Sequence, residues 1–145
     1  MEIIARNRKA SFQYEILEKI EAGIVLTGTE VKSVRNKDVS INESFAHINN
    51  GEIFIYEMHI GEYKQGNRQN HEPKRVRKLL LHKREIARIV GKIKQKGYTM
   101  VPLSLYFKES LVKVELALVR GKTQIDKRED IKKRDVDREI QRAMR

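Results

Sequence analysis

Hydrophobic and polar residues alternate or recur regularly over the first 121 positions, and these patterns predict most of the secondary structure. Phe12, Tyr14 and Ile16 alternate with polar residues, which is typical of a half-buried β-strand, and the apolar run 23–28 continues it. Thr29 is a suitable N-cap for a short helix in which apolar residues follow three positions apart. The first part of the chain is therefore expected to form a strand followed by a helix.

Two later segments predict β-hairpins. Strands at 44–48 and 52–60 flank the Asn-Asn-Gly sequence at 49–51, whose residue types tolerate the positive φ angles of a tight turn. Residues 98–107 and 111–119 are expected to form a second hairpin of longer strands. The last of these strands places four apolar side chains on one face: Val112, Val114, Leu116 and Leu118.

One amphipathic helix is predicted between the two hairpins. Apolar residues recur at helical spacing from His82 to Lys96, and Gly97 follows where a C-cap glycine is expected. Before this helix, residues 64–78 carry glycine, asparagine and proline, which are loop signals. We expect residues 79–81 to form a strand that anchors this loop.

These elements predict an α+β, mainly β fold, in which hairpins form a small β-barrel with short helices on its rim. Residues 1–10 are polar and basic and are expected to form a mobile arm. Beyond residue 121 the composition changes, because residues 122–145 hold nine basic, six acidic and only six apolar residues. We therefore expect a barrel domain at 1–121 and a basic C-terminal tail at 122–145 that is disordered in isolation.

Composition and charge limit the function. The 145 residues carry a net charge of +11, which favours a polyanionic partner, nucleic acid before an anionic membrane. The absence of cysteine excludes disulfides and thiolate zinc sites. No apolar run approaches the ~18 residues of a membrane span, and residues 1–10 lack the apolar core of a signal peptide. We expect a cytoplasmic protein with no membrane partner.

The positive charge is concentrated in one segment. Residues 64–84 contain eight Lys or Arg residues and one acidic residue, Glu72. Lys and Arg at this density neutralise phosphates, and the Asn, Gln and His side chains among them can bind base edges and 2′-hydroxyls. A solvated charged loop is the plainer interpretation, but the density of the charge favours a nucleic-acid surface.

The four histidines leave an enzymatic alternative open. His47, His59, His71 and His82 could supply an acid–base pair that cleaves RNA, or a metal site. No H-E-x-x-H spacing, phosphate-binding glycine loop or nucleophile elbow occurs, so we expect a protein without catalytic activity, metal or cofactor. A generic basic protein that binds DNA or a membrane surface is the third interpretation.

Several long blocks of the sequence point to one known family. They are "NRKA" at 7–10, "EAGIVLTGTEVKSVR" at 21–35, "GNRQNHEPKRVRKLLLHKREI" at 66–86, "KGYTMVPLSLYFK" at 96–108, "KVELALVRGK" at 113–122 and "DKREDIKKRD" at 126–135. In this order and at this spacing, the blocks strongly resemble the SmpB family, the SsrA-binding proteins of bacterial ribosome rescue. The resemblance covers nearly the whole chain.

The resemblance implies a fold, a function and partners. The implied fold is a closed, antiparallel β-barrel of the oligonucleotide-binding (OB) type with flanking short helices. The implied function is that of a non-catalytic adaptor, which binds the tRNA-like domain of transfer-messenger RNA (tmRNA) and delivers it to stalled ribosomes for trans-translation. The implied partners are tmRNA, which is also called SsrA RNA, the ribosome and, through the shared tmRNA, elongation factor Tu.

Carried over by position, the resemblance also implies an RNA face. Glu21 could accept hydrogen bonds from an unstacked guanine, Gly23 would let the RNA backbone approach, and Leu80 could lie against an exposed base. The basic members would neutralise phosphates. The complete face is Asn7, Arg8, Lys9, Glu21, Gly23, Arg77, Lys78, Leu80, His82 and Lys113.

The tail of the family occupies the decoding centre and the empty mRNA channel, and the resemblance implies that it becomes helical there. This chain departs from the family at Ile125, where members often carry a His or Tyr suited to stacking on ribosomal RNA bases. The residues that match the tail motif are Gly121, Lys122, Asp126, Lys127, Arg128, Lys132, Lys133 and Arg134.

Overall fold

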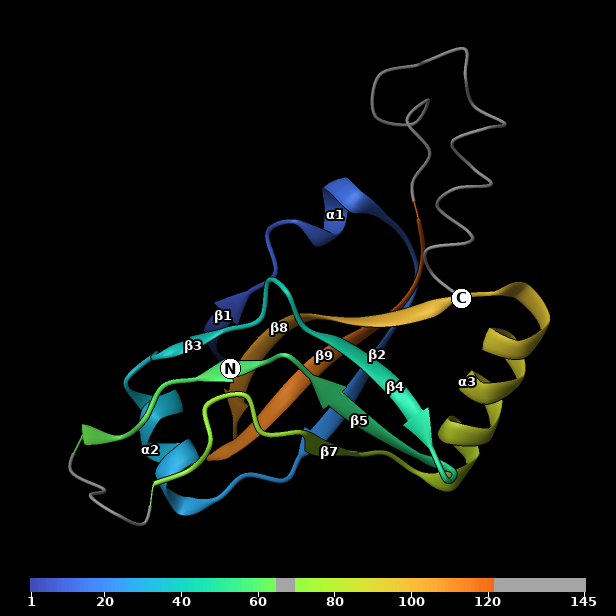
Figure 1. Ribbon diagram of the computed structural model, residues 1–145. Helices are drawn as coiled ribbons and strands as arrows, with labels where there is room; N and C mark the ends of the chain where they lie inside the picture. The colour runs from blue at the N-terminus through green and yellow to red at the C-terminus, as the bar shows by residue number, and fades with distance from the viewer. Residues whose placement is uncertain (65–69, 122–145) are drawn as a thin grey trace.

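A computed structural model of the chain describes residues 1–64 and 70–121, and β-strands dominate them (Figure 1). The mainly β class with a few short helices is confirmed. None of the helices in these two ranges is long and apolar enough to cross a membrane. The elements are β1 (Glu2–Arg6), α1 (Ala10–Gln13), β2 (Tyr14–Ile24), α2 (Gly28–Arg35), β3 (Val39–Ser40), β4 (Phe45–Asn49), β5 (Glu52–Tyr56), β6 (His59–Ile60), β7 (Arg77–Leu80), α3 (Lys83–Lys96), β8 (Thr99–Lys108) and β9 (Leu111–Gly121).

Seven of the strands form one antiparallel sheet, in the order β1-β8-β4-β5-β7-β2-β9. Strand β9 also pairs with β8, so the series of pairings returns on itself over six strands, and β1 is attached to β8 outside this series. The β4–β5 hairpin lies in front of β8, β9 and β2 in Figure 1. The pairing of β4 with β8 is the shortest, because it has one register pair, Ala46 opposite Met100.

The main core lies on the inner face of this sheet. The expectation for β9 is confirmed, because Val114, Leu116 and Leu118 are buried in this core and Val112 packs against it. The alternate residues of β9 pack on the opposite face in a smaller cluster. Its buried members are Ala10, Val101, Ala117 and Val119.

The two hairpins and the amphipathic helix are confirmed. Asn50 and Gly51 have φ angles of 53° and 76°, as a two-residue turn between antiparallel strands requires. Helix α3 ends at Gly97, which has the left-handed φ of 68° and donates its N–H to the carbonyl of Ile93. The hairpin of β8 and β9 follows directly.

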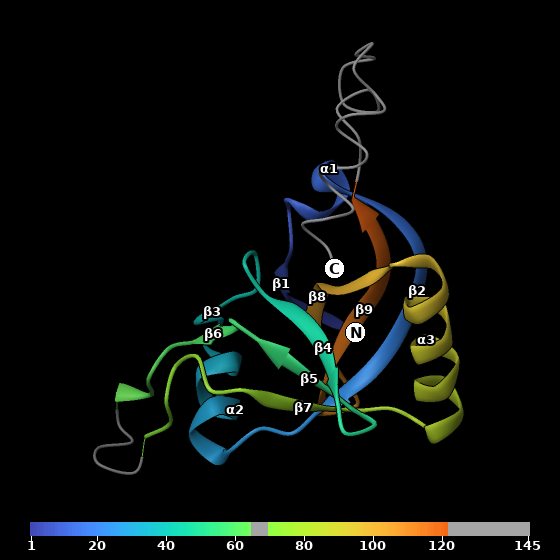
Figure 2. The same ribbon diagram turned by 45° about the vertical axis from the view of Figure 1, so that its right-hand side comes forward.

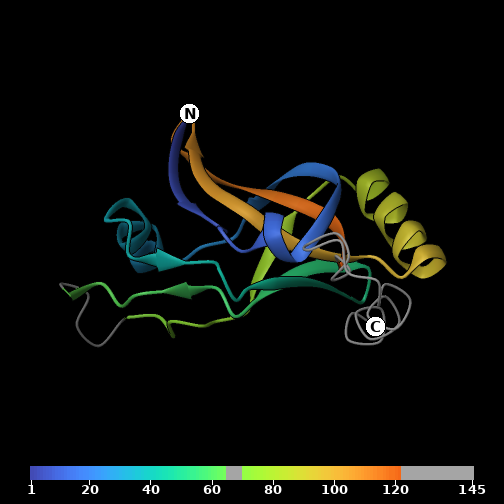
Figure 3. The ribbon, with the colours of Figure 1, turned by 90° about the horizontal axis from the view of Figure 1, so that it is seen from above.

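Helices α2 and α3 lie at opposite ends of the molecule when it is seen from above (Figure 3). Helix α3 runs beside β2 (Figure 2), where Arg88 and Lys92 form ion pairs with Glu18 of β2. These cations hold the pKa of Glu18 below its ordinary value, although burial opposes the shift. Ile89 is fully buried beneath the helix.

The expectation that residues 1–10 form a mobile arm is corrected, because most of this segment is held in a strand and a helix. Residues of β1 pair with β8 from Glu2↔Phe107 to Arg6↔Ser104, and Ile4 is buried. The basic residues Arg6, Arg8 and Lys9 concealed this short strand, whose partner lies about a hundred positions away in the chain.

Three boundaries also differ from the sequence prediction. Phe12 lies in α1 and is exposed, so the strand begins at Tyr14. The N-cap of α2 is Thr27, because it forms a capping box with Glu30 that Thr29 does not form. The predicted strand 52–60 is interrupted at Glu57, whose φ is 60°, and the residues beyond it pair with β3 as β6. The strand expected at 79–81 is confirmed in part as β7, which begins two residues earlier and ends at Leu80.

Replacing Gly97 by Ala should destabilise the protein by about 1 kcal/mol, because an alanine side chain is strained at the left-handed φ of this C-cap. Gly91→Ala in the same helix is the matched control. A Cβ there would meet no atom within 4 Å, and it should raise stability by about 0.5–1 kcal/mol through helix propensity. Urea unfolding followed by circular dichroism measures both, and shifts of equal sign would contradict the assignment.

Candidate nucleic-acid interface

Three neighbouring strands bring together residues that lie far apart in the sequence. Gly23 on β2 lies opposite Leu80 on β7 and opposite Lys113 on β9. The side chain of Leu80 is half exposed. The row across β7, β2 and β9 therefore presents an apolar side chain, a bare backbone position and a cation side by side.

A cleft of about 640 Å³ surrounds this row, and it is called here the β2–β7 cleft. It collects five of the ten residues expected on the RNA face. Two further basic residues and one acidic residue, none of which the sequence argument named, also line it. The lining residues are Lys19, Ile20, Glu21, Gly23, Leu80, Leu81, His82, Glu85, Arg88 and Lys113.

Gly23 suits the closeness of β7. A Cβ built at Gly23 would lie 3.3 Å from the Cβ of Leu80, a tight contact that Leu80 would have to relieve by a shift of a few tenths of an ångström. The glycine therefore lets Leu80 lie across β2 while half of its surface stays open to solvent. An exposed aliphatic side chain over an open backbone can pack against the flat face of a base.

Glu21 is a fixed anion on this basic surface. The hydroxyl of Tyr106 donates to its Oε2 at 2.5 Å, and Lys108 Nζ lies 3.4 Å from both carboxylate oxygens. The Tyr106 hydrogen bond, with the nearby Lys108 and Lys113, holds the pKa of Glu21 below its ordinary value. Burial and the Glu21 charge raise the pKa of Tyr106, so it remains a donor at neutral pH. Glu21 is thus an ionised, oriented acceptor, as recognition of a base edge needs.

The expected arm residues lie beside a second cleft, of about 370 Å³, which Tyr106 lines together with Asn7 and Arg8. The Tyr106–Glu21 hydrogen bond joins the two clefts. Asn7 is held by the fold, because its Nδ2 donates to the carbonyl of Pro102 at 3.0 Å and its Oδ1 accepts from Lys9 N–H at 3.2 Å. Lys9 forms an exposed ion pair with Glu43 at 2.6 Å.

Lys78 and His82 are also exposed in part. Lys78 lies on the outer face of β7, opposite Phe54 of β5, and its Nζ is 3.2 Å from Glu52. This exposed pair is worth little and can open to bind a phosphate. His82 is the residue before α3, and its backbone N–H donates to Glu85.

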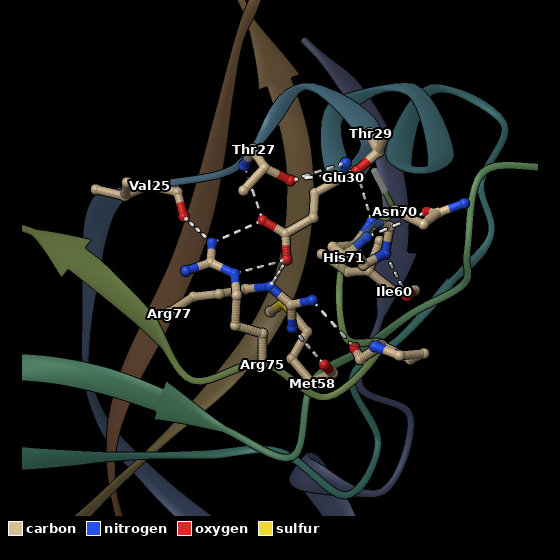
Figure 4. Close-up of polar contacts among 11 residues, drawn as sticks. Val25, Thr27, Thr29, Glu30, Met58, Ile60, Asn70, His71, Arg75 and Arg77 are labelled. Atoms are coloured by element: carbon tan, nitrogen blue, oxygen red, sulfur yellow. Dashed lines mark hydrogen bonds and ion pairs between the residues drawn. The ribbon is translucent and has the colours of Figure 1, made fainter. Parts of the chain in front are cut away.

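Arg77 is the exception, and its expected contact with RNA is corrected. Its side chain is fully buried, and its Nε donates to Glu30 Oε2 at 2.5 Å. The remaining donors reach the carbonyls of Met58 at 2.6 Å and Pro73 at 3.0 Å (Figure 4). The sequence could not separate Arg77 from its exposed basic neighbours, because charge density does not show which cation meets a buried carboxylate.

The buried carboxylate of Glu30 joins Arg77 to Arg75, and these three residues are called here the Glu30 cluster (Figure 4). Glu30 Oε1 accepts from Arg75 Nη2 at 2.7 Å and from the Thr27 N–H at 2.8 Å. Burial alone would raise the pKa of Glu30, but these hydrogen bonds and the Arg77 charge lower it below its ordinary value. The sequence does contain a signal for the Thr27 contact of Glu30, because Thr27-x-x-Glu30 matches a capping box. It contains no signal for the contacts of Glu30 with the two arginines.

His71 is occupied in the fold. Its Nε2 lies 2.8 Å from the carbonyl of Ile60 and its Nδ1 lies 2.9 Å from the Thr29 hydroxyl. Because a carbonyl can only accept, Nε2 carries the proton and Nδ1 accepts from Thr29. Within residues 1–64 and 70–121, no three His, Asp or Glu side chains gather in a way that could hold a metal ion.

The tail assignments lie almost wholly outside the described residues. Gly121, the last residue of β9, is opposite Tyr14 and is buried. The other assigned residues are not described by the structure: Lys122, Asp126, Lys127, Arg128, Lys132, Lys133 and Arg134.

The sequence and the fold are both similar to those of known proteins. The family model for "SmpB protein" matches residues 4–145. An "SsrA-binding protein" of Carboxydothermus hydrogenoformans is 61% identical over 143 residues, which are 99% of this chain and 96% of that protein. One of Geobacillus kaustophilus is 54% identical over 99% of this chain and 92% of its own. A solved chain described as "tmRNA-SmpB: a journey to the center of the bacterial ribosome" is 44% identical, with a TM-score of 0.70 over 94% of each chain.

The lowered pKa of Glu30 predicts a pH dependence of folding. A carboxyl whose pKa is lower when folded stabilises the protein above the unfolded pKa of about 4.3, and this contribution is lost as the pH falls through the folded value. The free energy of unfolding should therefore decrease from about pH 5 towards pH 3. Glu30→Gln should lower stability at pH 7 by roughly 3 kcal/mol and flatten the decrease.

Urea unfolding at several pH values tests this prediction. Glu43→Gln is the control, because Glu43 also forms an ion pair, with Lys9, but is exposed, so stability at pH 7 should change little. An equally steep pH dependence in Glu30→Gln and the unmodified chain would show that Glu30 does not titrate as inferred.

Proposed function

The chain belongs to the SmpB family, and from this we propose how its surface serves the function of that family. It acts as an RNA-binding adaptor that binds tmRNA in trans-translation, the ribosome-rescue pathway. The observation that carries the proposal is the β2–β7 cleft, which gathers Glu21, Gly23, Leu80, His82 and Lys113 into one surface. A chain with a net charge of +11 has the electrostatics that RNA requires.

Each residue of the cleft has a separate task in this proposal. Lys113, with Lys78 on the neighbouring outer face, neutralises phosphates of the tRNA-like domain. Glu21, oriented by Tyr106, accepts from the edge of an unstacked base, and Leu80 packs on a base face above Gly23. Arg8 and Lys9 extend the surface past Tyr106; the Arg8 N–H donates to Asn42 and the Lys9 N–H donates to Asn7.

Two parts of the proposal go beyond the cleft. We propose that the ring of strand pairings is a closed OB-like barrel that forms a domain at 1–121, supported by the return of β9 to β8. We also propose that residues 122–145 are a separate tail that enters the decoding centre and the mRNA channel. The residues proposed to act there are Gly121, Lys122, Asp126, Lys127, Arg128, Lys132, Lys133 and Arg134.

The proposed adaptor has no catalytic activity of its own. His71, one of the four candidate histidines, has both ring nitrogens in hydrogen bonds, which supports a structural role for it. We propose that the protein works in the cytoplasm, where it meets elongation factor Tu through the tmRNA that both bind. Incubation with a tRNA-like RNA distinguishes it from an RNA-cleaving enzyme, since only the enzyme yields shorter products.

Substitutions in the cleft should separate affinity from selectivity. Lys113→Ala should weaken binding of the tRNA-like domain of tmRNA and flatten its salt dependence by about one phosphate contact. Glu21→Gln should instead reduce the preference for this RNA over duplex DNA of equal length, although it makes the protein more basic. Fluorescence anisotropy at several salt concentrations measures both effects.

The control for Lys113→Ala is Lys96→Ala, which removes the same charge from the exposed last turn of α3. It should leave the affinity nearly unchanged. If both lysine variants lost the same affinity, or if Glu21→Gln bound the RNA more tightly with unchanged preference, recognition by a shaped cleft would be wrong.

Removal of the tail should abolish function while leaving RNA binding intact. A chain ending at Lys122 retains the β2–β7 cleft, so it should bind the tRNA-like domain with an affinity close to that of the full chain. In a reconstituted assay with stalled ribosomes it should fail to support transfer of the nascent peptide to the alanine of tmRNA. Combined Asp126→Ala, Lys127→Ala and Arg128→Ala substitutions should reproduce most of this defect. Near-normal tagging by the truncated chain would show that the tail is dispensable.

A further inference from the structure

The leucine run at 79–81 poses a problem of strand register that its own sequence cannot solve. Leu79 is buried, with 1% of its surface exposed, whereas Leu80 is 50% exposed in the β2–β7 cleft. A slip of one residue exchanges the two faces of a strand, but the slip that brings Leu80 to the place of Leu79 and Leu81 to the place of Leu80 keeps a leucine on each face. The hydrophobic pattern, which usually fixes the register of a strand, therefore does not distinguish these two registers of the leucine run.

The strand pairings of β7 are also short. With β2 it forms two register pairs, Gly23↔Leu80 and Ile24↔Leu79. One further backbone hydrogen bond runs from the Val25 N–H to the carbonyl of Lys78 at 3.0 Å. Backbone hydrogen bonds are available in any register, so this ladder does not choose among them. A side chain with a specific partner must make the choice.

Arg77 is that side chain. It shares the inner face of β7 with Leu79, and it is fully buried against the Glu30 carboxylate. Its other donors satisfy the carbonyls of Met58 and Pro73, so the guanidinium fits in one position only. A slip by one residue would withdraw Arg77 and leave Glu30 buried without this partner, which is strongly unfavourable.

Arg75 extends the same restraint to β2. Its guanidinium donates to both oxygens of Glu30, at 2.7 and 3.2 Å, and its Nη2 also donates to the carbonyl of Val25 at 3.2 Å (Figure 4). Val25 directly follows the end of β2 and bonds β7 through its own N–H. The Glu30 cluster thus ties α2, the end of β2 and β7 to one another.

We infer that the Glu30 cluster sets the register of β7 and so determines which leucine of the run faces RNA in the β2–β7 cleft. Glu30, Arg75 and Arg77 are positioning residues in this view, and they act on RNA only through Leu80 and Lys78. The inference rests on the proposed RNA-binding function, but the register itself can be measured without RNA.

The test replaces the whole cluster by apolar residues, Glu30→Met with Arg75→Met and Arg77→Met. Removing all the charges together leaves none buried and unpaired, so thermal stability should be retained. Arg35→Met is the control, because it gives the same net charge from an exposed position at the end of α2. Cross-strand nuclear Overhauser effects from Gly23 report the register, and anisotropy reports binding of the tRNA-like domain.

In the triple variant we expect the Gly23–Leu80 contact to be joined or replaced by a contact from Gly23 to Leu81, and affinity to fall about tenfold. The control should keep the single Gly23–Leu80 register and its affinity. A triple variant with this register alone, or with the affinity of the control, would overturn the inference. If neither the control nor the unmodified chain bound the RNA, the proposed function would fail while the Gly23 contacts still decided the register.

A second variant decides the matter if the triple variant does not fold. Arg77→Lys keeps the charge beside Glu30, but an ammonium group cannot reproduce the planar set of donors that reaches Glu30, Met58 and Pro73 together. We expect it to fold, to show a second register at Gly23 and to bind the RNA severalfold more weakly than Arg35→Met. A single register with full affinity would refute the inference.

Discussion

The described structure depends most on one carboxylate that is buried in a strongly basic chain. Glu30 accepts hydrogen bonds from Arg75, Arg77 and the Thr27 N–H, and none of its side-chain surface is exposed. Such a group is expensive to bury and even more expensive to leave without partners. Helix α2, the segment that leads into β7 and the end of β2 must therefore come together around it, or none of them is well placed.

Acidic side chains thus hold several elements of this strongly basic protein together. Glu18 attaches α3 to β2 through Arg88 and Lys92, and Glu21 is held by Tyr106 at the edge of the cleft. The three carboxyls all have lowered pKa values, because each is surrounded by donors. The basic residues divide accordingly into those that build the fold and those that remain available to RNA.

The sequence predicted elements whose signals are local. The Asn50-Gly51 turn, helix α3 with its Gly97 cap and the β8–β9 hairpin need only neighbouring residues to form, and all three are confirmed. Strand β1 was missed because it is short, is followed by basic residues and pairs with a strand that is distant in the chain. The resemblance to a family named five residues that the cleft brings together, but it also placed Arg77 on the surface. A run of basic residues does not reveal which of them a buried acid will capture.

The long pairing of β2 with β9 has a consequence for the synthesis of the protein. Its register runs from Tyr14↔Gly121 to Gly23↔Lys113, so the paired residues lie between 90 and 107 positions apart. Strand β1 likewise pairs with β8, which is synthesised about a hundred residues later. Pairings between distant residues form late, because closing the intervening chain costs entropy before the contacts between the strands can stabilise the fold. A ribosome translating this message must therefore release nearly all of residues 1–121 before the sheet can assemble, and the edges of the early strands remain unpaired until then.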